Sequence, residues 1–253
     1  MRHLPLQKSN NLSKKNSIFF TIAILVSLLS SSFVKASGSS EFSLDNLALY
    51  DLSASLETRL YETIKLDEYG LNRDALDYAV QGYEKLVAEG MVANSRYLTV
   101  IDFSQPIFNK RFYLLDVENM ELVVNTFVMH GKNTGNEMAE NFSNKMNSNQ
   151  SSLGFYVTKK PYYGSRGYSL KLEGLEPEFN SNAAVRGVVL HGSDYINEER
   201  ALNRNIERSL GCPAIPHAWN PDVINYLKEG SVMFIYFPSE EYLEHSEILN
   251  SGI

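Results

Sequence analysis

The hydrophobic period of the chain changes at Tyr97, and this change limits the folds that the sequence can adopt. From residue 45 to 89, apolar residues recur at three- to five-residue steps, which is the period of amphipathic helices. Asn72 is a suitable helix N-cap, and Gly90 is suitable just past a helix end. We therefore expect a helical hairpin in an N-terminal extension, residues 41–95.

After Tyr97 the period shortens to two, and short runs of β-branched and aromatic residues indicate strands. The runs interpreted as strands are 97–103, 111–117, 121–129, 153–158, 168–172, 188–191 and 232–237. Two short helical patterns lie among them, 196–206 and 221–228, the second with Asn220 as N-cap. The pattern predicts a mainly β domain over residues 96–240, a sandwich or barrel with short helices. With the hairpin, the fold is α+β overall.

Two segments carry too little apolar character to enter a core. Residues 132–152 are nearly all Asn, Ser, Gly, Lys, Met and Glu, which indicates a long loop. Loops of that length in compact domains are either functional, as lids or binding loops, or flexible. Residues 241–253 contain several glutamates and predict a solvated acidic tail.

The first forty residues have the composition of an export signal. They contain no acidic residue, carry Lys14 and Lys15, and then run apolar from residue 18 to 34. The run is diluted by serines and is at the short end of the about 20 apolar residues that a membrane span needs. We expect residues 1–36 to be a cleaved signal peptide that leaves no stable membrane span.

The charge balance argues against a nucleic-acid partner. The chain carries 23 Lys and Arg against 30 Asp and Glu, a net charge of -7. Signal cleavage removes five basic and no acidic residues, which leaves a net charge of about -12. Nucleic-acid binding normally requires a basic surface.

Cys212 is the only cysteine, so it cannot form an internal disulfide. An unpaired cysteine in an exported protein is either a retained reactive thiol or a small, buried, inert side chain. Ser209, Gly211 and Pro213 surround it with a small-residue turn that exposes backbone amides near the sulfur. Such amides can form an oxyanion hole.

A reactive thiol needs a base, which is most often a histidine. His130 and His191 each precede a glycine at the end of a predicted strand, and His191 is the natural first choice of partner for Cys212. His217 lies in a loop that can also approach the thiol. A zinc site built from these three histidines lacks any known ligand spacing, so we expect no metal and no cofactor.

Several motifs resemble one enzyme family. His191-Gly192-Ser193, followed by Ser209-Leu210-Gly211-Cys212, resembles the His-Gly and Ser-x-Gly-Cys signature of L,D-transpeptidases of the YkuD type, which cross-link peptidoglycan. Residues 101–106, 129–135 and 150–156 are similar to the branch known as the murein L,D-transpeptidase catalytic-domain family. The resemblance covers residues 97–238 and implies that residues 96–240 are a catalytic domain.

The resemblance implies a function and a set of site residues. Cys212 would be acylated by a peptidoglycan tetrapeptide stem, with release of D-alanine, and would pass the acyl group to an amine. His191 would be the general acid and base, and the amides of Gly211 and Cys212, together with a donor such as Ser209, would hold the oxyanion. The residues expected to contact substrate are Gly192, Ser193, Arg208 and His130. Such an enzyme would work in the periplasm or cell envelope of a bacterium.

The sequence departs from the usual family pattern beside Cys212. Members usually carry His, Arg or Asn where Leu210 stands, and an aliphatic residue followed by Arg where Pro213 and Ala214 stand. A guanidinium there would bind polar groups bidentately, which Ala cannot do. We expect Arg208 to supply this charge. The acceptor also stays open: water would make the protein an L,D-carboxypeptidase, a free D-amino acid would make it an exchange enzyme, and a non-catalytic peptidoglycan-binding module is a further alternative.

Overall fold

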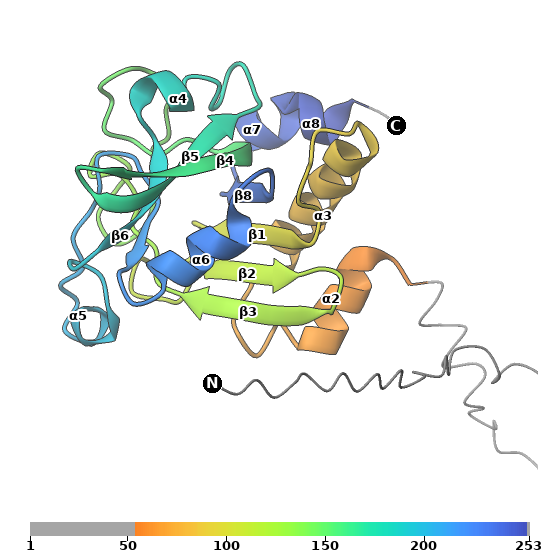
Figure 1. Ribbon diagram of the computed structural model, residues 1–253, viewed down its shortest axis with the longest axis horizontal. Coiled ribbons are helices and arrows are strands. Elements are labelled where there is room, and N and C mark those ends of the chain that lie inside the picture. The colour runs from red at the N-terminus through yellow and green to blue at the C-terminus, as the bar shows by residue number, and fades with distance from the viewer. Residues whose placement is uncertain (1–53, 252–253) are drawn as a thin grey trace, which may run out of the picture. The chain divides into compact units, whose positions relative to one another are not determined.

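The computed structural model describes residues 54–251, which belong to one compact unit. Its centre is an eight-stranded sheet in the order β3-β2-β1-β8-β4-β5-β6-β7 (Figure 1). The strands are β1 (Tyr97–Asp102), β2 (Phe112–Asp116), β3 (Glu121–Thr126), β4 (Gly154–Gly164), β5 (Gly167–Gly174), β6 (Val189–Ser193), β7 (Ala214–Pro216) and β8 (Val232–Tyr236). Just after β3, Met129 forms a bridge with Ala214 of β7, so the sheet nearly closes on itself. The predicted mainly β, barrel-like domain is confirmed.

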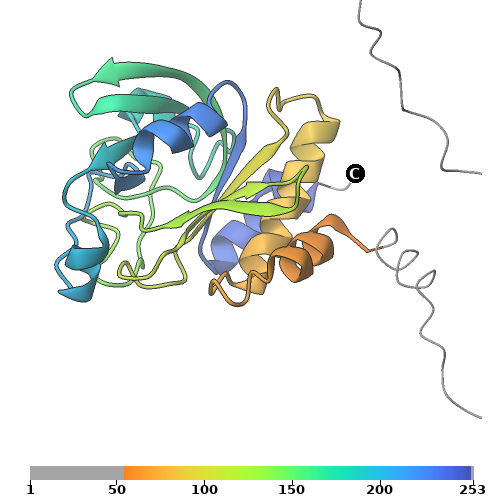
Figure 2. The same ribbon diagram turned by 60° about the horizontal axis from the view of Figure 1, so that its bottom comes forward.

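Three strands differ most from the predicted runs. β3 ends at Thr126, three residues before the predicted end. β4 does not end at Thr158 but continues to Gly164, because its last residues pair with β5 in a hairpin. The tip of this hairpin is exposed, so the sequence there has no alternating pattern of buried residues. Figure 2 shows this green and teal hairpin projecting from the sheet. β7 was not predicted, since three residues that include Pro216 give no alternating signal.

Two helices lie in the region expected to form the hairpin, α2 (Leu56–Ile64) and α3 (Arg73–Ala88). The first residues of that region, 41–53, and the expected signal peptide, 1–36, lie outside the described residues. Asn72 caps α3, because its side chain accepts a hydrogen bond from the Asp74 amide at 2.8 Å. Buried residues of both helices and of the sheet form one hydrophobic core.

Three short helices cover other parts of the sheet: α4 (Ala183–Arg186), α5 (Glu198–Leu202) and α6 (Asn220–Leu227). α5 is shorter than the predicted 196–206, because the chain enters the left-handed region at Arg204, with φ 51°. The N-cap of α6 is Trp219 and not Asn220, whose side-chain amide instead donates to the carbonyl of Tyr168 at 2.8 Å. In Figure 1, α5 lies at the opposite end of the sheet from α2 and α3.

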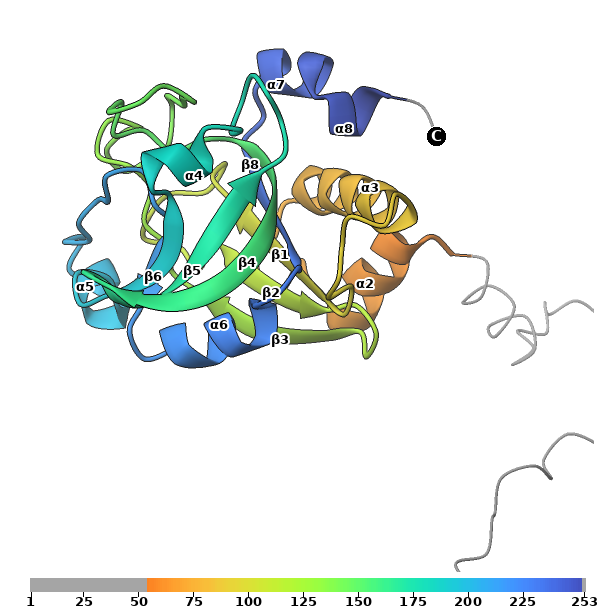
Figure 3. The ribbon, with the colours of Figure 1, turned by 45° about the horizontal axis from the view of Figure 1, so that its top comes forward.

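The prediction of a solvated acidic tail is wrong for the described part of residues 241–253. This part forms α7 (Glu240–His245) and α8 (Glu247–Asn250), which Figure 3 shows standing over α3. Tyr242 is fully buried, and its hydroxyl donates to the buried carboxylate of Glu176 at 3.0 Å. Glu176 also accepts from the Phe155 amide at 2.7 Å and from the Ser246 hydroxyl, so it joins the C-terminal helices to β4. Burial raises the pKa of this carboxyl.

The described helices were compared with the length and apolar character of a membrane span. Among residues 54–251, no helix has the length and apolar character that crossing a bilayer requires.

Candidate active site

The pairing of β6 with β7 brings Cys212 and His191 into one region. The two strands are parallel, with His191 opposite Ala214, and the His191 amide donates to the carbonyl of Pro213 at 3.4 Å. Cys212 therefore comes level with the start of β6, where the Val189 amide donates to its Sγ at 3.5 Å. The register of this short strand pair sets the position of the thiol.

The turn before Cys212 is held by its own polar groups. The Ser209 hydroxyl donates to the Cys212 carbonyl at 2.6 Å and accepts from the Gly211 amide at 3.0 Å. Gly211 has φ 118°, and a Cβ there would lie 2.7 Å from the carbonyl oxygen of Gln150, so only glycine fits. The turn thus presents the sulfur at a fixed place beside the loop that contains Gln150.

This arrangement changes the expected oxyanion site. The Ser209 hydroxyl and the Gly211 amide, both expected as oxyanion donors, are hydrogen-bonded to each other inside the turn. Within residues 54–251, the amide of Cys212 makes no hydrogen bond, so it remains available. Ser209 and Gly211 shape the turn, and the Cys212 amide is the candidate donor.

His191 is oriented by a backbone carbonyl. Its Nδ1 lies 2.8 Å from the carbonyl oxygen of Gly192. Because a carbonyl only accepts, Nδ1 carries the proton and Nε2 of the neutral ring is left as a base. Burial lowers the pKa of His191, the bond to Gly192 raises it, and the charges of Arg166 and His217 lower it.

The thiol of Cys212 is partly buried and bonded to the backbone. Its Sγ lies 3.6 Å from the carbonyl oxygen of Gly187, to which the thiol donates. Burial raises the pKa of this thiol, while the Val189 amide and the charges of Arg166 and Arg186 lower it, with a net rise. Both members of the pair are therefore uncharged at neutral pH, and the thiol is not hydrogen-bonded to His191 in this structure.

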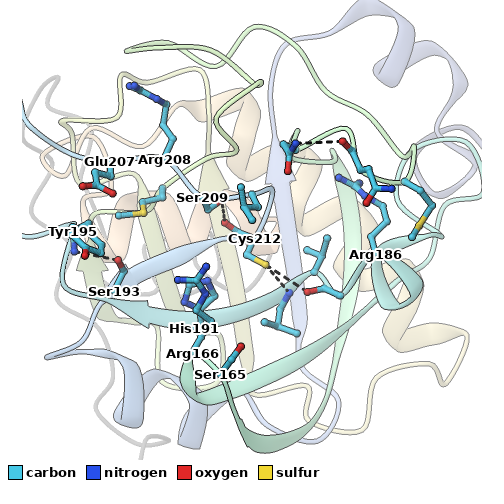
Figure 4. Close-up of a pocket in the computed structure, with 18 of the residues that line it drawn as sticks. Ser165, Arg166, Arg186, His191, Ser193, Tyr195, Glu207, Arg208, Ser209 and Cys212 are labelled. Carbon is cyan, nitrogen blue, oxygen red and sulfur yellow. Dashed lines mark hydrogen bonds between the residues drawn. The ribbon is translucent and has the colours of Figure 1, made fainter.

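Cys212 and His191 line the same pocket, of about 490 Å³ (Figure 4). Among the expected substrate-contacting residues, Ser193 and Arg208 also line it. Gly192 does not, and its carbonyl acts on His191 instead. His217 does not line the pocket either. It packs against Gly192, since a Cβ built on Gly192 would lie 2.3 Å from Nδ1 of His217.

The expectation that His130 contacts substrate is wrong, because its side chain has no exposed surface. Nδ1 accepts a hydrogen bond from the buried guanidinium of Arg111 at 2.9 Å, and Nε2 lies 3.1 Å from the carbonyl oxygen of Gly135. Burial, with the charge of Arg111 adding to it, lowers the pKa of His130 to about 4. Its carbonyl accepts from the Ser209 amide at 2.9 Å, so His130 supports the turn of Cys212 from behind.

A metal site would have to be built from His130, His191 and His217. Across the described residues, no group of three or more His, Cys, Asp or Glu side chains gathers where it could hold a metal ion. The ring nitrogens of His130 instead pair with Arg111 and with the carbonyl of Gly135.

Comparison with known proteins assigns the family. The sequence profile of the family described as the L,D-transpeptidase catalytic domain matches residues 67–236. This chain belongs to that family. The matched span contains the whole sheet, the pocket and the turn of Cys212.

Solved structures of L,D-transpeptidases are similar to this chain at low identity. The L,D-transpeptidase from Mycobacterium smegmatis is 11% identical, with a TM-score of 0.34, 56% of this chain covered and 59% of that one. The L,D-transpeptidase LdtMt1 in complex with imipenem is 13% identical, with a TM-score of 0.33 and the same two coverages. The enzyme from Xylanimonas cellulosilytica is 16% identical, with a TM-score of 0.29, 60% of this chain covered and 68% of that one. This chain thus spans less than two thirds of the first two structures. No curated protein matches.

The L,D-transpeptidase-type pocket also contains residues that the motifs did not indicate. Arg166 comes from the tip of the β4–β5 hairpin, Arg186 from α4, and Asn147 and Asn149 from the long loop. The turn Gly164-Ser165-Arg166-Gly167 between tyrosine-rich strands is a hairpin signal that would have located Arg166 near a strand end. Arg186 has no such signal, because only the fold brings α4 to the pocket.

Proposed function

We propose that this chain is an exported cysteine L,D-transpeptidase that acts on peptidoglycan stem peptides. The observation that carries the proposal is the β6–β7 register, which sets Cys212 and His191 in one pocket, where no residue in 54–251 is hydrogen-bonded to Nε2 of His191. Membership of the L,D-transpeptidase catalytic domain family supports the same reaction class.

In the proposed first step, the Cys212 sulfur attacks the carbonyl carbon of the L-centred third residue of a tetrapeptide stem. The thiol proton moves to Nε2 of His191 as the carbon–sulfur bond forms. The carbon–nitrogen bond to the terminal D-alanine then breaks, and the imidazolium returns its proton to the leaving amine. The products are free D-alanine and a thioester on Cys212.

The second step transfers the acyl group. An acceptor amine attacks the thioester carbonyl while His191 takes its proton. The carbon–sulfur bond breaks, the thiolate recovers the proton from His191, and a new amide is formed. The Cys212 amide stabilises the oxyanion in both steps, and the bond from His191 to Gly192 holds the imidazole in the required tautomer.

The Cys212 side chain must change rotamer or shift slightly at the start of this cycle. In the resting structure the thiol donates to Gly187, and attack requires that its proton point to His191 instead. The bond to Gly187 is a weak sulfur hydrogen bond, so breaking it costs about 1 kcal/mol or less.

The test is product analysis after incubation with purified tetrapeptide muropeptides. We expect free D-alanine and cross-linked dimers, identified by mass. In a matched stem, the side-chain amine of the third residue, which would be the acceptor, is acetylated. This stem can still acylate Cys212 but offers no acceptor amine, so it should give no dimers. Trimmed tripeptides as the only product would assign water as the acceptor, and exchanged stems would assign a free D-amino acid. Binding to peptidoglycan without any product would contradict the proposal.

The site of action is part of the proposal. Residues 1–36 would direct export and would be removed, and the acidic mature chain would act in the cell envelope of a bacterium.

A further inference from the structure

The pocket concentrates positive charge on an otherwise acidic protein. Three arginines line it, Arg166, Arg186 and Arg208, against one carboxylate, Glu207. The whole chain carries a net charge of -7. A site of this charge favours a ligand with a negative group.

Arg186 is already occupied by the protein. Its guanidinium donates to the carbonyl of Ser143 at 2.6 Å and to the hydroxyl of Ser148 at 3.1 Å, and also to Gln150 and Ser152. These bonds hold the loop that borders the pocket. Arg186 therefore has few free donors for a ligand.

Arg208 was expected to supply the positive charge next to Cys212. Figure 4 shows its side chain directed away from the Cys212 sulfur. Its charge acts on the buried His130 behind the turn, whose pKa it helps to lower. In this orientation the guanidinium of Arg208 does not face a substrate group bonded to the Cys212 sulfur.

Arg166 is the remaining arginine. It lies at the exposed tip of the β4–β5 hairpin and reaches the pocket from the side of His191 (Figure 4). Arg166 lines the same pocket as His191 and Cys212, and its charge lowers the pKa of both groups. In residues 54–251, Arg166 takes part in none of the ion pairs.

The proposed reaction places a carboxylate at this point. His191 must protonate the leaving nitrogen, so the leaving amino acid lies beside His191 when its bond breaks. The α-carboxylate of that amino acid is two bonds from the leaving nitrogen. A guanidinium that enters the pocket from the side of His191 is therefore on the side where this carboxylate lies, and guanidinium pairs with carboxylate through parallel hydrogen bonds.

We propose that Arg166 is the specificity-determining residue that binds the C-terminal carboxylate of the acyl donor. This inference rests on the proposed function. It assigns to the hairpin tip a guanidinium that the family pattern has after the nucleophile, a position where this chain has Ala214.

The experiment measures the rate of acylation of Cys212 by intact mass, with two donors. One is a tetrapeptide stem with a free C-terminal carboxylate, and the other is the same stem as a C-terminal carboxamide. For the carboxylate donor, we expect Arg166→Gln to lower the acylation rate at low donor concentration by about 10-fold, and Arg166→Lys to restore part of it. For the carboxamide, Arg166→Gln should slow acylation much less, because only the effect of Arg166 on the pKa of His191 and Cys212 is then lost.

Lys160→Gln is the matched control, because Lys160 is an exposed positive charge on the same hairpin and does not line the pocket. It should react like wild type with both donors. Equal slowing of both donors by Arg166→Gln, or no slowing of either, would overturn the assignment of Arg166 alone. A wild-type protein that neither donor acylates would overturn the proposed function, and this inference with it.

Discussion

Burial sets the charge states of the two residues that carry the proposed chemistry. It raises the pKa of the Cys212 thiol and lowers that of the His191 imidazole, so the neutral pair is favoured over thiolate and imidazolium. The nucleophile is then generated during attack, when the proton moves to His191. A preformed ion pair, as in some thiol enzymes, is not favoured by this site.

The pH dependence of alkylation tests this charge state. Because the folded thiol has a raised pKa, the rate of Cys212 alkylation by iodoacetamide should still be rising at the pH where an ordinary thiol reaches its plateau. The protein unfolded in denaturant is the control, and its alkylation should level off at lower pH. A plateau already reached below neutral pH in the folded protein would show a stable thiolate and contradict the neutral pair.

At the level of single residues, the sequence indicated a candidate nucleophile and base, but it did not show which other side chains reach the pocket. Cys212 and His191 were selected as candidates because a reactive thiol needs a base and because the motifs around both are short and local. His130 has a similar motif, a histidine before glycine at a strand end, yet it is buried against Arg111. The buried partner lies 19 residues away and only the fold brings it there, so local pattern could not separate the two histidines.

Among the elements, α3 depends on a close approach to the sheet. A Cβ at Gly82 would lie 2.1 Å from the ring of Phe155, which is fully buried and stacks on Phe234 with centroids 4.3 Å apart. The helix can pack at this distance only because residue 82 has no side chain.

Gly82→Ala should therefore destabilise the protein. Alanine improves helix propensity by about 1 kcal/mol, but forcing a methyl group into a packed core costs about 1–3 kcal/mol, and the contact with Phe155 places the cost at the upper end. We expect a net loss in the free energy of unfolding, measured by urea denaturation. Glu84→Ala, on the exposed face of α3, is the control and should change it by less than about 0.5 kcal/mol. A Gly82→Ala protein as stable as wild type would contradict the packing of α3 on Phe155.

The elements that were predicted well are those whose burial alternates or is complete. β1, β2 and β8 consist of β-branched, aromatic and aliphatic residues and appear close to the expected bounds. The outer half of β4 is mostly exposed, so no strand was predicted beyond Thr158, and the C-terminal helices contain several glutamates, so a tail was predicted there. Their structure comes from pairing with β5 and from the buried Glu176, which are long-range contacts that a local window does not contain.

At the scale of the molecule, the fold gathers the site from distant parts of the chain. The turn of Cys212 is held by the carbonyl of His130 and fits against Gln150, while Arg166 arrives from a hairpin and Arg186 from α4. The long loop, expected to be either a binding loop or a flexible segment, borders the pocket and is bonded to Arg186. The sequence therefore predicted the fold class and indicated Cys212 and His191, which share the pocket, as the candidate pair, while the walls of the pocket follow from topology.

The central claim is that Cys212 is the residue that carries the acyl group. Its most direct test is intact-mass analysis of wild type and Cys212→Ala after brief incubation with a tetrapeptide stem, followed by peptide mapping. Wild type should gain the mass of the stem without its terminal D-alanine, on the peptide that contains Cys212, and Cys212→Ala should gain nothing. The same adduct in Cys212→Ala, or an adduct on another residue of wild type, would contradict the account.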